Sequence, residues 1–266
     1  MTRGDRILQL ADALARALDS IAWTAPVTHA YDPLVYARVG FERFTARALA
    51  DGGTRRVLLL GLNPGPHGMV QTGVPFGDPG WARALVGTDV EIGQPPSLHP
   101  DRPVYGIRAT RTETSGRRLW DGLTQIWTGS PATVPDAERQ RALDTVLADV
   151  FVMNYCPVAL FDVNGKNITP DDLRKLGARP DLDHLLACCD EHLRDVVRTL
   201  DPAFVIGIGN FARDRASRAL GNAWTCNNGA KLRIGKVLHP SPQSSLANTG
   251  WLELARKELR VGGVIR

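Results

Sequence analysis

The first fifty residues show apolar positions at helical spacing. Six apolar residues recur three or four positions apart or as neighbours: Ile7, Leu8, Ala11, Leu14, Ala15 and Leu18. This pattern predicts an amphipathic helix over residues 4–19. A second helix is predicted over residues 33–50, because Pro33 suits the first turn of a helix. We therefore expect residues 1–50 to form a helical N-terminal extension of one domain that spans residues 1–266.

Four short apolar runs then have the length and composition of buried strands: residues 56–62, 149–154, 203–208 and 232–238. Helical patterns lie between and after them, over residues 116–127, 137–147, 182–200, 211–220 and 246–259. Continuous apolar strands that alternate with helices are typical of a parallel sheet covered on both faces. The predicted fold class is α/β, a three-layer sandwich with a central, mainly parallel four-stranded sheet flanked by helices.

A long connection over residues 87–114 is rich in proline and glycine. Loops of this length inside a compact domain usually carry function.

Composition narrows the class of protein. The chain has 266 residues, 43% hydrophobic and 23% charged, with a net charge of +4. This mild positive charge permits a nucleic-acid partner without requiring one. No apolar run approaches the ~20 residues of a membrane span, so no membrane partner is expected. Charged residues interrupt the first twenty positions and break any signal-peptide core, which predicts a cytoplasmic protein.

The four cysteines are Cys156, Cys188, Cys189 and Cys226. An iron–sulfur cluster would need four convergent thiolates. Cys188 and Cys189 are neighbours in a predicted helix, where successive side chains diverge by about 100°, and the chain has no C-x-x-C pair. We expect buried free thiols, and neither a metal nor another cofactor.

Polar residues gather just past the ends of three predicted strands. The first strand leads into residues 61–69 (GLNPGPHGM), the second into 154–157 (NYCP) and the fourth into 239–242 (HPSP). Ligands of open α/β sheets bind beyond the carboxyl ends of the strands. These three segments are therefore expected to point polar groups into one crevice.

Two long motifs make the chain resemble the single-strand-selective monofunctional uracil-DNA glycosylases, a branch of the uracil-DNA glycosylase superfamily. They are residues 61–77 (GLNPGPHGMVQTGVPFG) and 239–251 (HPSPQSSLANTGW). Shorter support comes from residues 115–120 (SGRRLW), 151–157 (FVMNYCP) and 167–170 (NITP). The resemblance extends over residues 57–260 and implies a uracil-DNA glycosylase-like fold.

The resemblance implies a DNA repair enzyme that hydrolyses the N-glycosidic bond of uracil during base excision repair, by base flipping and water attack. It makes Asn63 the residue that positions the water and His239 a hydrogen-bond donor to the uracil oxygen. An amide is no strong base, but it can orient water. Uracil leaves as a delocalised anion, and one good donor to the developing charge is worth about 3–4 kcal/mol.

The resemblance also implies a base pocket. Asn154 would read the uracil edge with one donor and one acceptor, and Phe76 would stack on the flipped base, worth about 1–3 kcal/mol. Gly65 and Met69 would shape the pocket floor. The family tolerates 5-substituted uracils such as 5-hydroxymethyluracil, for which the glycine leaves room for a water near C5.

Residues 241–249 correspond to the family's wedge, which offsets the cost of unstacking. The DNA-binding residues expected there are Ser241, Pro242, Gln243, Ser244 and Asn248. The family usually has arginine where Gln243 stands, lysine where Thr249 stands and an aromatic residue where His67 stands. The loss of two positive charges predicts weaker penetration of duplex DNA and a shallower salt dependence.

Four arginines form a further candidate phosphate contact, or simply a solvated face: Arg108, Arg111, Arg117 and Arg118. The expected partner is uracil-containing DNA, single- or double-stranded. We expect a monomer to bind it at the bacterial nucleoid.

Other functions stay open at this point. Within the superfamily, base specificity could shift to xanthine or hypoxanthine. The iron–sulfur type of uracil-DNA glycosylase is disfavoured by the cysteine spacing and by Asn63. A nucleosidase-like hydrolase and a non-catalytic DNA-damage binder remain possible on the same fold.

Overall fold

The computed structural model describes residues 1–130, 136–177, 179–221 and 223–266. Its centre is a parallel sheet of four strands in the order β3-β2-β6-β7. The strands are β2 (Val57–Gly61), β3 (Val150–Asn154), β6 (Phe204–Ile208) and β7 (Arg233–Val237). In the register, Val57 faces Val150 on one side and Phe204 on the other. The four predicted strands and their parallel arrangement are confirmed.

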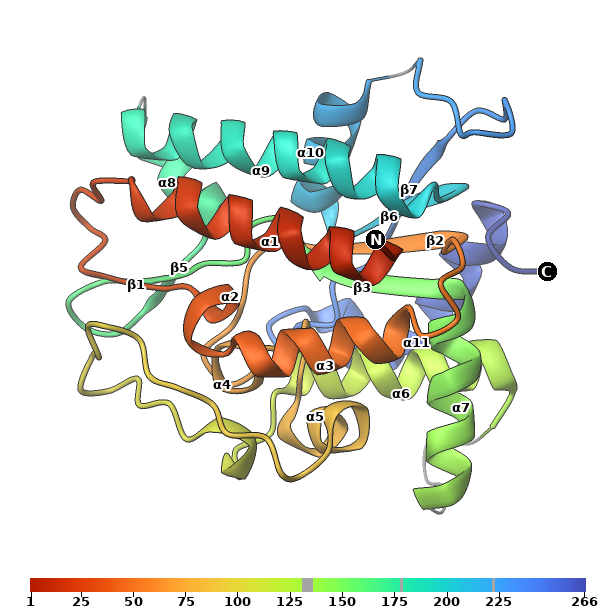
Figure 1. Cartoon of the computed structure of the whole chain (residues 1–266), viewed down its shortest axis with the longest axis horizontal. Coiled ribbons are helices and arrows are strands. Elements are labelled where there is room, and N and C mark those ends of the chain that lie inside the picture. The colour runs from red at the N-terminus through yellow and green to blue at the C-terminus, as the bar shows by residue number, and fades with distance from the viewer. Residues whose placement is uncertain (131–135, 178, 222) are drawn as a thin grey trace.

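Helices cover both faces of this sheet (Figure 1). On one side lie α9 (Pro180–Leu200) and α10 (Asn210–Leu220), and on the other α6 (Thr114–Thr128) and α11 (Ser245–Val261). Every residue of β2, β3 and β6 is buried, whereas the edge strand β7 is partly exposed. Burial on both faces explains why the inner strands are uninterrupted apolar runs. The three-layer α/β fold is the one predicted.

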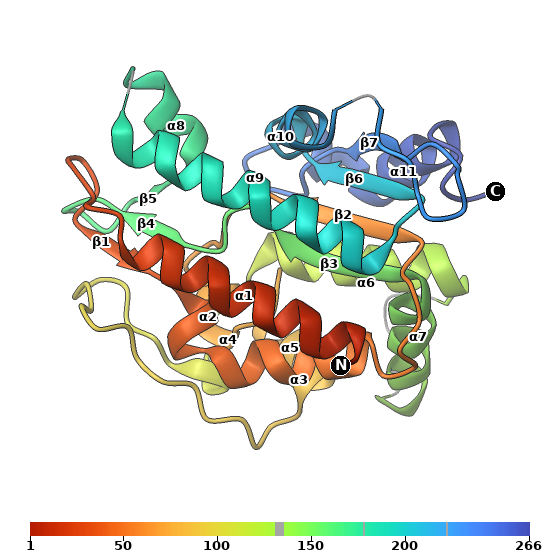
Figure 2. The ribbon, with the colours of Figure 1, turned by 45° about the horizontal axis from the view of Figure 1, so that its top comes forward.

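The N-terminal helix α1 (Arg3–Asp19) lies along α9 (Figure 2). Its first turn is closed by a capping box between Thr2 and Asp5. Its apolar stripe, which includes Ile7 and Leu14, belongs to the same core as the central sheet. Residues 1–50 are mainly helical, as expected, but they share the domain's core and also contribute the strand β1 (His29–Tyr31).

The predicted helix over residues 33–50 is wrong in one respect, because it is two helices. They are α2 (Pro33–Tyr36) and α3 (Arg38–Ala48), with a break at Ala37. The break lies where the short helix α4 (Met69–Thr72) ends in Gly73. A side chain on Gly73 would collide with the Ala37 carbonyl, so two stretches of backbone meet here without a Cβ between them.

Several short elements were not predicted. Strands β1, β4 (Ala159–Phe161) and β5 (Asn167–Ile168) form a small antiparallel sheet in the order β1-β4-β5. The unpredicted helices are α5 (Pro79–Val86), η1 (Gly106–Arg108) and α8 (Pro170–Lys175), whereas α7 (Asp136–Asp149) confirms the helix predicted over residues 137–147. Elements of two to eight residues are too short to show a hydrophobic period.

All four cysteines are free. Cys156, Cys189 and Cys226 are buried, as predicted, whereas Cys188 is only partly buried. Among the described residues, no helix combines the length and the apolar character needed to cross a membrane.

Candidate active site

The carboxyl ends of β2 and β3 stay paired beyond the strands themselves. The Tyr155 amide donates to the Gly61 carbonyl at 2.9 Å, and the Cys156 amide donates to the Leu62 carbonyl at 2.9 Å. Asn154 therefore lies directly across from Gly61. Two of the polar segments singled out from the sequence lie side by side at this edge of the sheet.

Gly61 is the point where two site side chains meet the backbone. A Cβ at this position would collide with the Oδ1 atom of Asn154 and with the Phe76 ring. Only a glycine fits between the amide and the ring without displacing either. The structure thus brings the predicted base reader and the predicted stacking ring against one residue of the first motif.

Asn154 is buried, and its Nδ2 atom approaches the Met69 sulfur at 3.3 Å. Met69 is equally buried and begins α4. A thioether is a weak hydrogen-bond acceptor. The amide can therefore exchange this contact for a stronger partner, and a buried amide without a good partner costs about 1–3 kcal/mol.

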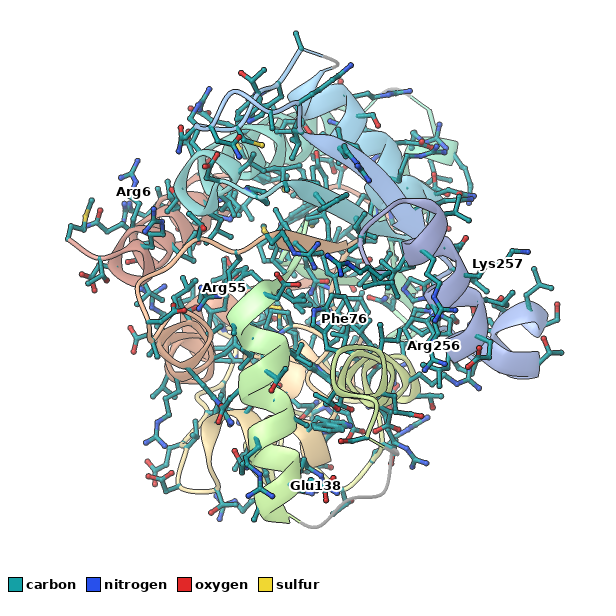
Figure 3. The ribbon with its side chains drawn as sticks, turned by 90° about the vertical axis from the view of Figure 1, so that its right-hand side faces the viewer. Arg6, Arg55, Phe76, Glu138, Arg256 and Lys257 are labelled. Carbon is teal, nitrogen blue, oxygen red and sulfur yellow. The ribbon has the colours of Figure 1, made fainter. Side chains whose placement is uncertain are left out.

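Phe76 adopts a backbone conformation that is unusual for a residue with a side chain. Its φ is 53°, and such left-handed conformations cost on the order of 1–3 kcal/mol and cluster at functional sites. The fully buried Thr72 holds this turn, because its hydroxyl donates to the Gly77 carbonyl at 3.3 Å and accepts from the Val74 amide at 3.2 Å. Figure 3 shows Phe76 inside the molecule, between the sheet and the helices.

The N-terminus of α6 supports the same turn. A Cβ on Gly116 would collide with the Phe76 carbonyl. Glu113 caps this helix by accepting from the amides of Ser115 and Gly116, and Asp78 accepts from the Glu113 amide at 2.9 Å. Burial raises the pKa of Glu113. Sequence reasoning missed Glu113, Asp78 and Thr72, although the motif over residues 115–120 pointed to this helix end.

His239 follows β7, and α11 anchors the strand end beside it. The Leu238 amide donates to Glu258 at 2.7 Å, and the Trp251 indole donates to the Leu238 carbonyl at 2.6 Å. The His239 ring lies 6.2 Å from the Phe76 ring, centroid to centroid. Burial lowers the pKa of His239 below its usual value of 6.5, so its imidazole is neutral at pH 7.

The loop after β2 carries three more candidates. Asn63 is partly buried, and its Nδ2 atom makes one long hydrogen bond, 3.4 Å to the Pro64 carbonyl. A Cβ on Gly65 would point into open space. Burial, and then the charges of Arg111 and Arg102, lower the pKa of His67 to about 4. The Asn63 amide is therefore weakly held, and the space at Gly65 is unfilled by neighbouring side chains.

The segment over residues 241–249, which corresponds to the family's wedge, is non-helical only as far as Ser244. Ser244 caps α11 by accepting from the Ala247 amide at 3.2 Å, so the helix begins at Ser245 and Asn248 lies in its first turn. Pro242, Gln243 and Asn248 are exposed, whereas Ser241 and Ser244 are partly buried. Leu246, which was not among the expected DNA-binding residues, is an apolar residue that is 61% exposed.

Arg118 braces this segment from α6. It donates to the Pro240 carbonyl at 3.2 Å and to the Asn248 Oδ1 atom at 2.7 Å, while the Asn248 Nδ2 atom donates to the Pro242 carbonyl at 2.8 Å. Arg117 instead lies 3.8 Å from Asp121. The four arginines considered together from the sequence therefore differ in role: Arg118 is already engaged with protein.

Comparisons with known proteins agree with this architecture. The family model of the uracil DNA glycosylase superfamily matches residues 50–260. The single-strand selective monofunctional uracil-DNA glycosylase of Rattus norvegicus is 34% identical over 248 residues, which cover 93% of this chain and 81% of the relative. That of Bos taurus is 35% identical over 235 residues, which cover 88% and 78%. The crystal structure of SMUG2 from Pedobacter heparinus has a TM-score of 0.58 at 15% identity and covers 99% of this chain and 98% of that one. This last likeness concerns the fold alone.

Proposed function

From the premise that this chain belongs to the uracil DNA glycosylase superfamily, and so is a DNA glycosylase that hydrolyses N-glycosidic bonds, we propose that it excises uracil by flipping the nucleotide out of the strand and directing water at its sugar. The observation that carries this proposal is the contact of Asn154 and Phe76 with Gly61, with His239 beside the same ring. An amide, a phenyl ring and an imidazole therefore meet at the carboxyl ends of the strands.

Recognition of the base rests on Asn154 and Phe76. The amide offers one donor and one acceptor to the O4 and N3 edge of uracil, whereas cytosine presents the opposite pattern. The Phe76 ring supplies a flat apolar face for the base. The weak contact of Asn154 with Met69 gives way when uracil enters, so the amide gains a better partner on binding.

Departure of the base rests on His239. Its lowered pKa keeps the imidazole neutral at pH 7. One ring nitrogen of a neutral imidazole still donates a hydrogen bond, and this donor faces the uracil oxygen on which negative charge develops. Stabilising that charge in a dry site contributes about 3–4 kcal/mol.

Water attack rests on Asn63. Its amide makes a single long hydrogen bond of 3.4 Å, so it is free to hold a water below the sugar. No strong base is required, because bond breaking runs ahead of water addition and leaves an oxocarbenium-like sugar that a weak nucleophile can capture.

The substrate range includes uracils with a polar group at C5, such as 5-hydroxymethyluracil. The space beside Gly65 supports this part of the proposal. A water in that space would bind the polar substituent, whereas the methyl group of thymine would displace the water without replacing its hydrogen bonds.

Flipping rests on residues 241–249. Leu246 projects into water from the first turn of α11, as an apolar wedge must before it enters a base stack. The segment is held in shape by Arg118 and Asn248, so little order has to be gained on binding. We propose that Leu246 fills the space left by the flipped base.

An oligonucleotide assay tests the proposal. Single- and double-stranded DNA with one uracil, 5-hydroxymethyluracil, xanthine or hypoxanthine is incubated with enzyme in EDTA and then treated with alkali. We expect cleavage at uracil, and at least about 100-fold loss in Asn63→Ala and in His239→Ala, the scale of a lost oxyanion donor. Leu176→Ala, 59% exposed on the surface after α8, is the matched control and keeps full activity.

Full activity in both Asn63→Ala and His239→Ala would contradict the assigned roles. Activity on free deoxyuridine with none on oligonucleotides would instead indicate a nucleosidase.

A further inference from the structure

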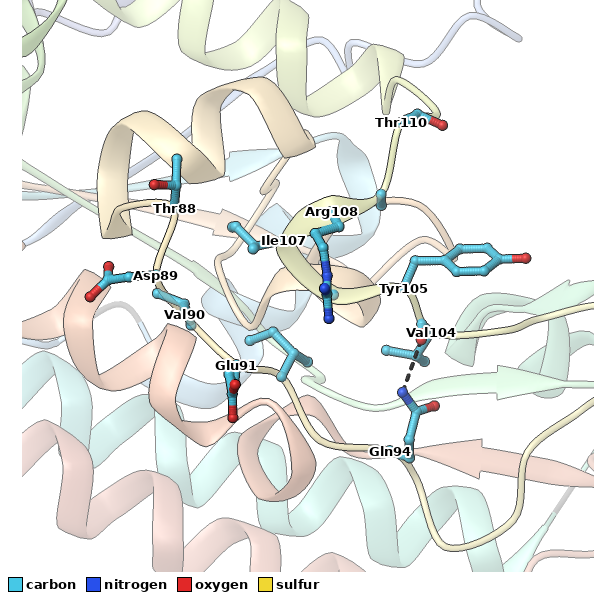
Figure 4. A pocket seen from close by; sticks show the side chains of 13 residues that line it. Thr88, Asp89, Val90, Glu91, Gln94, Val104, Tyr105, Ile107, Arg108 and Thr110 are labelled. Carbon is cyan, nitrogen blue, oxygen red and sulfur yellow. Dashed lines mark hydrogen bonds between the residues drawn. The ribbon is translucent and has the colours of Figure 1, made fainter.

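The long connection between α5 and α6 folds back on itself and lines an open hollow of about 1010 Å³. Figure 4 shows its two arms, residues 88–94 and 104–110. The Gln94 side chain donates to the Val104 carbonyl at 2.9 Å and ties the arms together. Arg43 on α3 forms an ion pair at 2.6 Å with Asp89 in the first arm. This loop is thus built into the protein by specific polar contacts.

A buried glutamine links the second arm, residues 104–110, to the loop after β2 that carries Asn63 and Gly65, here called the active-site loop. The Gln71 Nε2 atom donates to the Pro66 carbonyl at 2.9 Å and to the Pro103 carbonyl at 3.0 Å. Its Oε1 atom accepts from the Tyr105 amide at 2.8 Å. One side chain therefore connects the turn that carries Gly65 to the backbone of Tyr105, and their relative position is fixed.

The Tyr105 side chain itself is 66% exposed. Figure 4 shows its ring pointing away from the hollow, while Arg108 points into it. Tyr31 and Tyr155, by contrast, are completely buried. An aromatic ring in water on a fixed backbone adds nothing to the core, and flat exposed rings of this kind are where single-stranded nucleic acids stack their bases.

Two further arginines follow Tyr105 on the same connection. Arg108 and Arg111 are exposed, and neither forms an ion pair within the part of the chain that the structure describes. Arg111 and Arg102 lie close enough to His67, on the active-site loop, to lower its pKa. Guanidinium groups with no carboxylate partner remain free for phosphates.

We propose that Tyr105 and Arg111 form a binding platform for an unpaired nucleotide that flanks the target base, with its base stacked on Tyr105 and its phosphate held by Arg111. The inference rests on the proposed function, since it extends the same DNA site. A base can stack on Tyr105 only when it is unpaired, so the platform favours single-stranded substrates.

The test measures KM and kcat on single-stranded oligonucleotides whose uracil has several nucleotides on both sides, or on the 5′ or 3′ side alone. In Tyr105→Ala we expect KM to rise about 5- to 10-fold for the two-sided substrate and for one of the one-sided substrates, as for the loss of one base stack. The value of kcat stays the same. Tyr105→Phe keeps the ring and the wild-type KM, and Leu176→Ala serves as the surface control.

Fluorescence anisotropy with uracil-free single strands separates this inference from the proposed function. Tyr105→Ala should weaken that binding by the same factor, and Arg111→Gln should lower the slope of log K against log salt by about 0.7. If Tyr105→Ala binds single strands as the wild type does, or if Tyr105→Phe loses as much as alanine, the platform is wrong. If the wild type excises no uracil, the proposed function fails, whereas the anisotropy result still decides the platform.

Discussion

Two parts of this molecule that face the same edge of the sheet are built in opposite ways. In the turn over residues 61–77, Gly61 has no room for a Cβ and Phe76 is held at a φ of 53°. In the segment over residues 241–249, Pro242, Gln243 and Leu246 lie in water. The comparison teaches that the residues proposed to bind the base are held in place by close packing, whereas those proposed to contact the DNA strand lie at the surface, where side chains can change more freely.

The departures from the family pattern follow the same division. Gln243 and Thr249, which stand where the family usually has positive charges, are both in the exposed segment. The close-packed turn keeps the motif with the single exception of His67, which is partly buried. The two lost positive charges therefore fall in the exposed segment, and the packed turn departs from the family pattern only at His67.

The largest expected effect is that of Gly61→Ala. The added methyl group would push Asn154 and Phe76 out of position, and displacements of about 1 Å can cost 100-fold in rate. We expect kcat/KM on uracil DNA to fall by at least about 100-fold, and stability to fall by about 1–3 kcal/mol from overpacking. Gly65→Ala, whose Cβ has open space, is the matched control.

Excision kinetics and urea unfolding of both variants check this expectation. Gly65→Ala should unfold like the wild type and should lose more activity on 5-hydroxymethyluracil than on uracil. Equal behaviour of Gly61→Ala and the wild type would remove the contrast between the two regions.

A smaller effect is expected from Leu246→Ala. Without the apolar side chain, the gap left by a flipped base stays open, and we expect about 10-fold lower kcat/KM on duplex DNA. Single strands, which have less stacking to break, should be affected less. Leu246→Met, which keeps a long apolar side chain, is the control, and a loss that is equal on both substrates would contradict a wedge role.

The double variant Gln243→Arg, Thr249→Lys should bind duplex DNA more tightly than the wild type. Each new charge near a phosphate steepens the slope of log K against log salt by about 0.9 on duplex DNA. We expect tighter duplex binding at low salt and no change in kcat on single strands. Binding titrations at several salt concentrations measure both slopes, and an unchanged slope would show that this segment lies away from the phosphates.

The smallest effect is a dependence of stability on pH that arises on the closely packed side. The pKa of His67 is lowered to about 4 in the folded protein, against 6.5 for an unperturbed histidine. The unfolded chain therefore binds more protons between these values. Stability is complete above pH 6.5 and falls as the pH drops toward 4, by about 1–2 kcal/mol after allowance for partial exposure.

Replacement of His67 by phenylalanine removes this contribution, so urea unfolding of the variant should depend less on pH over the same range. A wild type whose stability is flat between pH 6.5 and 4 would contradict the lowered pKa. His239, whose pKa is lowered by burial, acts in the same direction, so some pH dependence remains in the variant.

Much of the fold was predictable because the sequence patterns that indicate its strands and helices are local. Strands buried on both faces must be apolar throughout, which explains why β2, β3 and β6 were found. The partly exposed edge strand β7 was found as well, and all four have ends within one residue of those predicted. The break at Ala37 was missed because it depends on the approach of Gly73 from another part of the chain. The helix predicted over residues 246–259 is confirmed to within two residues at each end, but its kink at Gly250 was not predicted.

The sequence by itself determined the central sheet, the order of its strands along the chain, and the candidates Asn63, Asn154 and His239 at strand ends, because hydrophobic pattern and motif are written in neighbouring residues. Only the tertiary structure decided that Gly61 separates Asn154 from Phe76, that Thr72 and Gly116 hold the Phe76 turn, and that Gln71 ties Tyr105 to the active-site loop. Most of these contacts form between groups that are far apart in the chain, and only the folded structure brings them within hydrogen-bonding or van der Waals distance. A local sequence pattern therefore cannot predict them.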